Sequence, residues 1–252
     1  MEEQNTTPEL ENIPAVKSPF SKRLENFWYH YKIHTIAAIF IIIAVTICTL
    51  QFCSKPKFDA YVLYAGDERI SNVRIGGDLS EYEKFQNAMK RVTPDKNENG
   101  EVLVAIENLF VANESELLLL KERGESIDNV ASLISEDSES LYFYMLSGDY
   151  YLLFLSERLF LEYDGEYGGG VFVDLAVYGG ENLRYAGDGT RGIYLDSFEK
   201  FSELDGIAAL DPEDTVVCLR KINALSSKAN GKKNVRSFDT AEAILKKIIE
   251  YD

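Results

Sequence analysis

The sequence predicts a single transmembrane helix followed by one α/β domain with a mainly parallel or mixed sheet. Two observations support this prediction. The 22 residues of 33–54 include no Asp, Glu, Lys or Arg. Beyond them, short apolar runs typical of strands alternate with segments that have the apolar spacing of amphipathic helices. We therefore expect a disordered cytoplasmic tail over 1–18, a juxtamembrane and transmembrane helix over 19–54, and an α/β domain over 55–252.

Composition excludes several classes of protein. The 252 residues include 26 Lys and Arg against 42 Asp and Glu, which gives a net charge of −16. We expect no nucleic-acid partner, because phosphates bind to basic surfaces. Three cysteines are too few for a disulfide scaffold. Both histidines, His30 and His34, lie at the start of the chain, so the domain over 55–252 lacks histidine-based catalysis and histidine zinc sites.

The apolar stretch has the length of a membrane span. At about 1.5 Å per residue, its helix would cover roughly 33 Å, close to the roughly 30 Å hydrocarbon core of a bilayer. The run is longer than the apolar part of a signal peptide and no small-x-small cleavage site follows it, so we expect an uncleaved anchor. Residues that suit the headgroup region form the expected membrane anchor: Trp28, Tyr29, Tyr31 and Lys32.

The distribution of basic residues predicts the orientation of this span. Four basic residues lie before it, between Lys17 and Lys32, whereas Lys55 and Lys57 follow it directly. Basic residues are enriched on the cytoplasmic side of membrane spans. We therefore expect a single-pass protein of the cell membrane with its N-terminus in the cytoplasm and its domain outside.

The expected strands of the domain are short apolar runs. The first, DAYVLYA, is followed by Gly66, which is a typical residue for ending a strand. Four more runs follow it along the chain, and all five are rich in β-branched, aromatic or leucine residues. The five runs are Asp59–Ala65, Glu101–Val111, Tyr150–Leu155, Val171–Tyr178 and Thr215–Lys221.

The expected helices lie between these strands. Ser80 and Glu83 form a capping box before a helix over 81–92. Apolar spacing predicts a second helix over 128–147, and Ser156 can cap a short helix that ends at Tyr163. The last helix is expected to open at Asp239 and Glu242. Residues 224–236, ALSSKANGKKNVR, are expected to form a mobile, locally basic loop.

Two segments resemble known groups of proteins. The run ENFWYHYKIHTI at 25–36, followed by the span and KPKFDAYVLYAG at 55–66, resembles uncharacterised single-pass membrane proteins of Gram-positive anaerobic bacteria. The segment LSGDYYLLFLS at 146–156 is similar to the helix-to-strand step in extracytoplasmic solute-binding proteins. This second resemblance implies a sheet like one lobe of a two-lobed binding protein.

The strand ends suggest a candidate ligand site. In parallel sheets, ligands bind beyond the carboxyl ends of the strands. An ordinary loop or helix cap is the alternative at each such position. The candidate ligand-binding residues are Gly66, Asp67, Asn108, Ser156 and Glu157.

The segment DKNENGE at 95–101 begins like a calcium-binding loop. An EF-hand loop needs Glu at its twelfth position, where this chain has Ile106. We therefore favour a helix-to-strand turn built on Asn99 and Gly100, with a looser calcium site as the alternative. The ligands of that site would be Asp95, Asn97, Asn99 and the carbonyl of Glu101. The sequence suggests no other cofactor.

These features favour a binding function without catalysis. We expect a membrane-anchored, extracytoplasmic binding module for a small solute or another surface protein. One alternative is a structural or assembly partner that acts through its membrane helix and the aromatic residues before it. The other is a hydrolase that uses a pair of carboxylates, for which the many acidic residues provide no recognisable pair.

Overall fold

The computed structural model describes residues 19–53, 56–122, 127–147, 149–166, 170–179, 182–222 and 224–251. The chain divides into two compact units, Met1–Pro56 and Lys57–Asp252. The tail expected over 1–18 lies outside the described residues.

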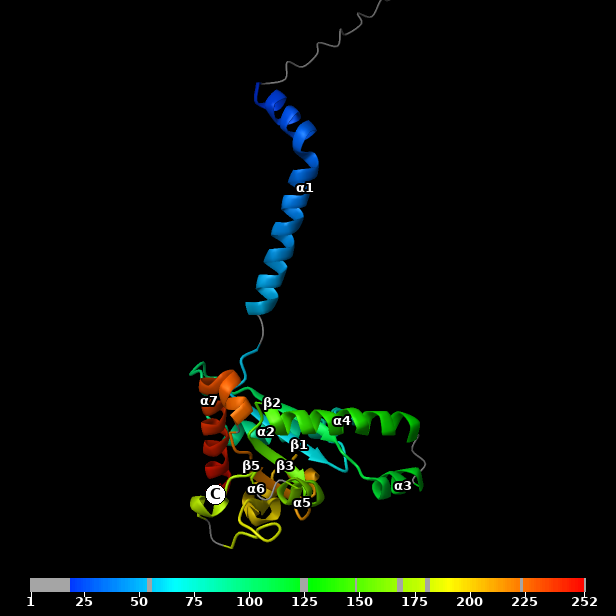
Figure 1. Ribbon diagram of the computed structural model, residues 1–252, viewed down its shortest axis with the longest axis vertical. Helices are drawn as coiled ribbons and strands as arrows, with labels where there is room; N and C mark the ends of the chain where they lie inside the picture. The colour runs from blue at the N-terminus through cyan, green and yellow to red at the C-terminus, as the bar shows by residue number, and fades with distance from the viewer. Residues whose placement is uncertain are drawn as a thin grey trace, which may run out of the picture. The chain divides into compact units, whose positions relative to one another are not determined.

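The first unit is described as one long helix, α1 (Pro19–Cys53), drawn in blue in Figure 1. Among the described residues, α1 is the one helix long and apolar enough to cross a membrane. Its three threonines, Thr35, Thr46 and Thr49, donate their hydroxyls to carbonyls one turn back at 2.7–3.0 Å. Such bonds satisfy the hydroxyls inside the helix, as a lipid environment requires. The helix is consistent with a membrane anchor or a signal sequence.

The second unit is an α/β domain that has, within the described residues, one five-stranded mixed sheet (Figure 1). The strand order is β2-β1-β3-β5-β4. β1 pairs in parallel with β2 and β3, whereas β5 is antiparallel to β3 and β4. The α/β fold and the mixed sheet expected from the sequence are confirmed. The strands are β1 (Ala60–Gly66), β2 (Val104–Phe110), β3 (Leu152–Ser156), β4 (Gly192–Tyr194) and β5 (Thr215–Leu219).

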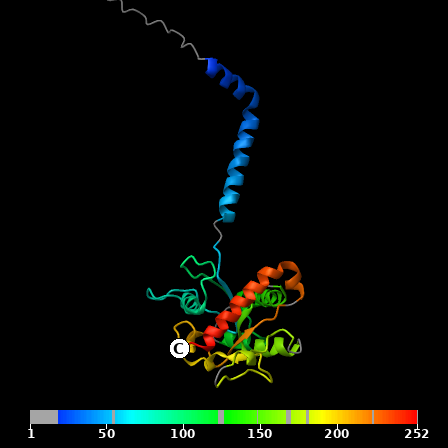
Figure 2. The ribbon, with the colours of Figure 1, turned by 90° about the vertical axis from the view of Figure 1, so that its left-hand side faces the viewer.

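Helices cover both faces of this sheet. Those of the domain are α2 (Glu81–Val92), α3 (Glu114–Glu122), α4 (Ile127–Ser147), α5 (Glu157–Glu166), α6 (Glu199–Ser202) and α7 (Ala224–Ile249). Short 3-10 turns cover Leu175–Tyr178, Leu195–Ser197 and Ala208–Leu210. In Figure 2, α7 lies in front of the sheet.

Alternate residues of the central strands pack into two separate cores. Val62 and Phe154 face the core that α2, α6 and α7 cover. Leu63 and Leu153 face the core that α4 and α5 cover. This alternation is the two-residue period of a strand, and it explains why strands buried on both faces have almost continuous apolar sequences.

The edge strand β2 is protected by side chains of its own domain. From α2, Gln86 donates to the carbonyl of Val104 at 2.8 Å and Tyr82 donates to that of Ile106 at 3.2 Å. A carboxylate oxygen of Asp137 accepts a bond from the N–H of the last β2 residue at 2.8 Å. An added strand would need these groups, so we expect no peptide to pair with this edge.

Two predicted elements are wrong. A strand was expected over Val171–Tyr178. The described residues of this stretch form one isolated bridge instead, between Phe172 and Arg220. Asp174 then accepts a bond from the N–H of Ala176 at 3.0 Å and caps the 3-10 turn that follows. The loop expected over 224–236 belongs to α7, so the last helix does not begin at Asp239. The first half of α7 is polar and lacks the apolar stripe from which a helix is recognised.

Candidate functional site

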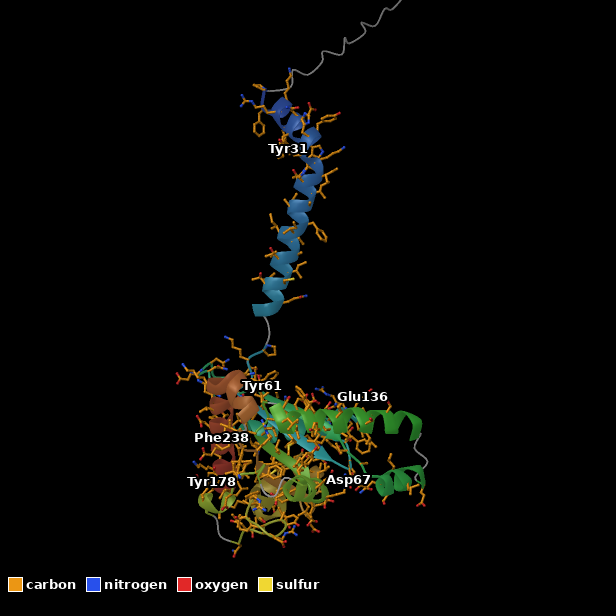
Figure 3. The ribbon with its side chains drawn as sticks, viewed as in Figure 1. Tyr31, Tyr61, Asp67, Glu136, Tyr178 and Phe238 are labelled. Carbon is orange, nitrogen blue, oxygen red and sulfur yellow. The ribbon has the colours of Figure 1, made fainter. Side chains whose placement is uncertain are left out.

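The connections of β1 create a crossover point at its carboxyl end. The chain passes from β1 to β2 on one side, then returns past β1 to β3 on the other. In open α/β sheets, ligands bind beyond the carboxyl ends of the strands at such a point. Gly66 ends β1 and Ser156 ends β3, directly after the pair of Ala65 with Leu155. Asp67, labelled in Figure 3, follows Gly66 at this end.

A side chain at position 66 would displace the Tyr64 ring. A Cβ atom at Gly66 would lie 2.7 Å from the Tyr64 hydroxyl. The ring therefore extends along β1 toward its carboxyl end, and it is 6% exposed. Burial raises the pKa of Tyr64, so its hydroxyl stays protonated and can donate a hydrogen bond. Nearby carboxylates raise this pKa further, those of Asp67, Glu68, Asp211 and Asp214.

Ser156 has a buried hydroxyl that the described protein does not use. The residue is 4% exposed, and its Oγ has no hydrogen-bond partner among the residues that the structure describes. Leaving a buried hydroxyl unpaired costs about 1–3 kcal/mol. By strand alternation, the side chain follows Leu152 and Phe154 and faces the same core as Tyr64. This end of the sheet therefore holds a hydrogen-bonding group that could bind a ligand.

The antiparallel strand β5 brings further carboxylates to the same end. Because β5 runs opposite to β3, its first residue pairs with the last residue of β3. Asp211 and Asp214 directly precede β5, and the N–H of Glu157 donates to the carbonyl of Asp214 at 2.8 Å. Burial raises the pKa of Asp214, and the carboxylates of Asp67, Asp211 and Glu157 raise it further. The acidic side chains therefore repel one another at this position.

We name this group the strand-end site. It comprises Tyr64, Gly66, Asp67, Ser156, Glu157, Asp211 and Asp214.

A tyrosine and an arginine border the strand-end site. Tyr194 donates its hydroxyl to Glu157, and its pKa rises to about 12 through burial and that carboxylate. Arg184 lies over the Tyr194 ring at 3.7 Å and forms an ion pair with Asp196 at 2.8 Å. The positive charge of Arg184 is therefore partly balanced by Asp196, which lies outside the site.

Asn108 forms two hydrogen bonds with the backbone of Ile70. Its amide nitrogen donates to the carbonyl of Ile70 at 2.9 Å, and its amide oxygen accepts from the Ile70 N–H at 3.3 Å. These bonds attach the loop after β1 to β2. No described contact brings Asn108 to the strand-end site, and its role as a ligand-binding residue stays a prediction.

The loop over 95–101 forms a turn that bonds to itself. Side-chain oxygens of Asp95, Asn97 and Asn99 accept bonds from the N–H groups of Gly100, Asn99 and Glu101 at 2.8–3.1 Å. The second oxygen of Asp95 is buried without a hydrogen-bond partner in the described part of the chain. Among described residues, no three His, Cys, Asp or Glu side chains lie together so that they could hold a metal ion. The calcium site stays a prediction.

The expected membrane-anchor residues lie on α1. Trp28, Tyr29 and Tyr31 are each at least half exposed, and Lys32 is exposed beside them. Tyr31 stacks on Phe27 with ring centroids 5.3 Å apart. These residues belong to the first compact unit, and the strand-end site belongs to the second.

Sequence reasoning missed Tyr64, Asp211 and Asp214. The sheet was expected to be mainly parallel or mixed, and the candidate site was placed by the parallel rule, under which the start of a strand lies far from a carboxyl-end site. The signal was present in DPED at 211–214, an acidic turn directly before a buried strand.

No family model, no curated protein and no solved structure matches this chain.

Proposed function

We propose that this chain is a membrane-anchored binding module whose extracytoplasmic α/β domain binds a small solute with a cationic group. The solute binds at the strand-end site. The observation that carries the proposal is the buried hydroxyl of Ser156, without a described partner, at the crossover point of the sheet. An ammonium group would donate to this hydroxyl and to the surrounding carboxylates as charge-assisted hydrogen bonds.

Electrostatics favour a cation at this position. Asp214 has neighbouring carboxylates that disfavour its ionised form, and a bound cation would reverse that effect. The described residues offer no cluster of three ligands for a metal ion. An organic ammonium needs acceptors spread around a larger group, which the strand ends provide. We therefore propose an amine-bearing solute.

The anchoring part of the proposal rests on α1. No residue of its apolar window is buried in the structure, and its threonine hydroxyls are bonded within the helix. The bias of basic residues before the span supports a cytoplasmic N-terminus and an outer domain.

The test is thermal unfolding of the full chain in lipid nanodiscs with diamines, amino acids, sugars and nucleotides. Binding to the native state raises the melting temperature by mass action. We expect a rise with amines, which the Asp214→Asn variant loses. Asp188→Asn removes an exposed carboxylate in the 187–190 turn and should keep the rise. A rise with sugars or nucleotides alone contradicts the cationic ligand. No rise with any compound favours an assembly partner instead.

A further inference from the structure

A group of exposed cations lies on the domain near the point where its chain begins. Lys57 is the first residue of the second compact unit. Lys232, Lys233 and Arg236 lie on the first half of α7, within about one helical turn of each other. All four side chains are exposed. We name these four residues the basic surface.

The turn at Lys96 fixes this part of α7 to the start of β1. The Nζ of Lys96 donates to the carbonyl of Arg236 at 3.0 Å and to the hydroxyl of Thr240 at 2.9 Å. The N–H of Lys96 donates to the carboxylate of Asp59, which directly precedes β1, at 3.0 Å. Figure 3 labels Tyr61, of β1, beside α7. The helix and the first residues of the domain are therefore neighbours.

Three of the four cations have no partner that balances their charge. Lys233 forms an ion pair with Asp149. The side chains of Lys57, Lys232 and Arg236 form no ion pair and donate no hydrogen bond within the part of the chain that the structure describes. These three charges are therefore open to a ligand anion.

The carboxylates near the basic surface do not cancel it. Asp239 and Asp59 act electrostatically on Lys96, and the cation of Arg236 acts on it in the opposite direction. Asp59 is 3% exposed, so it does not contribute a surface charge that a ligand would contact. Asp239 and Asp149 are fewer than the four exposed cations, which leaves the surface positive.

The covalent chain keeps the basic surface close to the end of α1. Residues 54–56 connect Cys53, the last residue of α1, to Lys57. At about 3.3–3.6 Å per residue, this connection spans at most roughly 14 Å. With α1 in a bilayer, Lys57 stays near the lipid headgroups in every orientation of the domain.

The charge of the remaining domain selects which face can approach a bilayer. From Lys57 onward the chain has 21 Lys and Arg against 37 Asp and Glu. Anionic lipids repel such a surface in general and attract a basic patch on it. Val235, which is 48% exposed between the cations of α7, adds an apolar contact of the kind that interfacial helices make.

We propose that the basic surface binds the phosphate-bearing headgroups of anionic lipids in the membrane that α1 anchors. The inference rests on the proposed membrane anchor and is independent of the proposed amine ligand. Lys57, Lys232 and Arg236 supply the charge, and Val235 contacts the boundary between headgroups and acyl chains. The strand-end site lies at the other end of β1, so this docking leaves it open to solutes.

A solvated helix face is the competing explanation. It accounts for the polarity of the first half of α7. It does not account for the sign of the charge, because three of the four charged residues in 231–239 are basic within an acidic domain.

The test is lysine acetylation of the full chain in nanodiscs, with the rate at each lysine measured by mass spectrometry. The discs contain phosphatidylcholine alone or with about one third phosphatidylglycerol. We expect acetylation of Lys232 to be at least about threefold slower in the anionic discs, and this difference to disappear in about 0.5 M NaCl. Lys247 is exposed near the other end of α7 and should react equally in both discs.

A matched pair of variants locates the contact. Arg236→Glu should remove most of the protection of Lys232. Arg69→Glu makes the same charge change at an exposed position beyond the carboxyl end of β1, and it should keep the protection. Copurification of the chain with both kinds of disc reports the anchor separately.

The contrary outcomes are distinct. Equal acetylation of Lys232 in the two lipids, in a chain that copurifies with the discs, overturns the docking and leaves the anchor. A chain that does not copurify overturns both. Equal slowing at Lys247 means a general effect of the disc charge, and slowing in neutral discs by added inorganic phosphate means a free phosphate site. Full protection in Arg236→Glu places the contact outside the basic surface.

Discussion

Replacing Ser156 by alanine should stabilise the domain while it weakens amine binding. The Ser156 hydroxyl is buried in a residue 4% exposed and has no described partner. An unpaired buried hydroxyl costs about 1–3 kcal/mol, and alanine removes it without deleting a methylene group. Allowing for the small gap left behind, we expect a gain of about 1 kcal/mol in the free energy of unfolding. In a domain of this size, that gain raises the melting temperature by about 2–4 °C.

Ser80 provides a matched control of opposite sign. It is also 4% exposed, but its Oγ accepts a bond from the N–H of Glu83 at 3.3 Å and donates to the Glu83 carboxylate at 3.1 Å. Loss of an N-cap costs about 1 kcal/mol, so Ser80→Ala should lower the melting temperature by a similar amount. The assay is thermal unfolding of the full chain, followed by circular dichroism, for both variants.

The sign of the change in melting temperature in Ser156→Ala shows whether the Ser156 hydroxyl is paired in the folded chain. A fall in melting temperature equal to that of Ser80→Ala would mean that the Ser156 hydroxyl is paired in the folded chain. Unchanged amine binding in a stabilised Ser156→Ala variant would show that the hydroxyl does not bind the ligand.

Four other predictions concern stability. The pKa of Asp214 is raised in the folded state, so ionising this carboxyl destabilises the fold as pH rises from 3.8 through the raised pKa. Asp214→Asn removes this effect, so it should raise the melting temperature at pH 7 but not below pH 3.8. Asp59 accepts three bonds at 2.9–3.1 Å, so Asp59→Ala should cost about 3 kcal/mol in urea unfolding. Gly206 has φ +92° and a Cβ there would lie 2.3 Å from the Phe85 nitrogen, so Gly206→Ala should cost about 3 kcal/mol or more in the same assay. Adding calcium or a chelator should leave the melting temperature unchanged, whereas a calcium-dependent rise would support the site over 95–101.

Elements with a local signal could be predicted from the sequence. The capping box of Ser80 and Glu83 forms as expected at the start of α2. The apolar runs overlap β1, β2, β3 and β5 because strands buried on both faces need nearly continuous apolar sequence. The first half of α7 gave no such signal, since its residues are mainly polar and its helix is not marked by an apolar stripe.

The candidate site could be predicted only in part, for a physical reason. Gly66 and Ser156 could be predicted because they lie at the ends of strands, and the apolar runs of those strands are visible in the sequence. The direction of β5 does not follow from composition, because an antiparallel strand buried on both faces has the same apolar sequence as a parallel one. Asp214 and Arg220, which lie before and after β5, were therefore not assigned to the two ends of the sheet.

The proposed function is tested most directly by calorimetric titration of 1,4-diaminobutane into the full chain in lipid nanodiscs. Wild type, Asp214→Asn and Asp188→Asn are measured side by side. We expect saturable binding to wild type and Asp188→Asn, and binding to Asp214→Asn weaker by about tenfold or more. Equal binding to all three chains, or no binding to wild type, would contradict a cation-binding strand-end site.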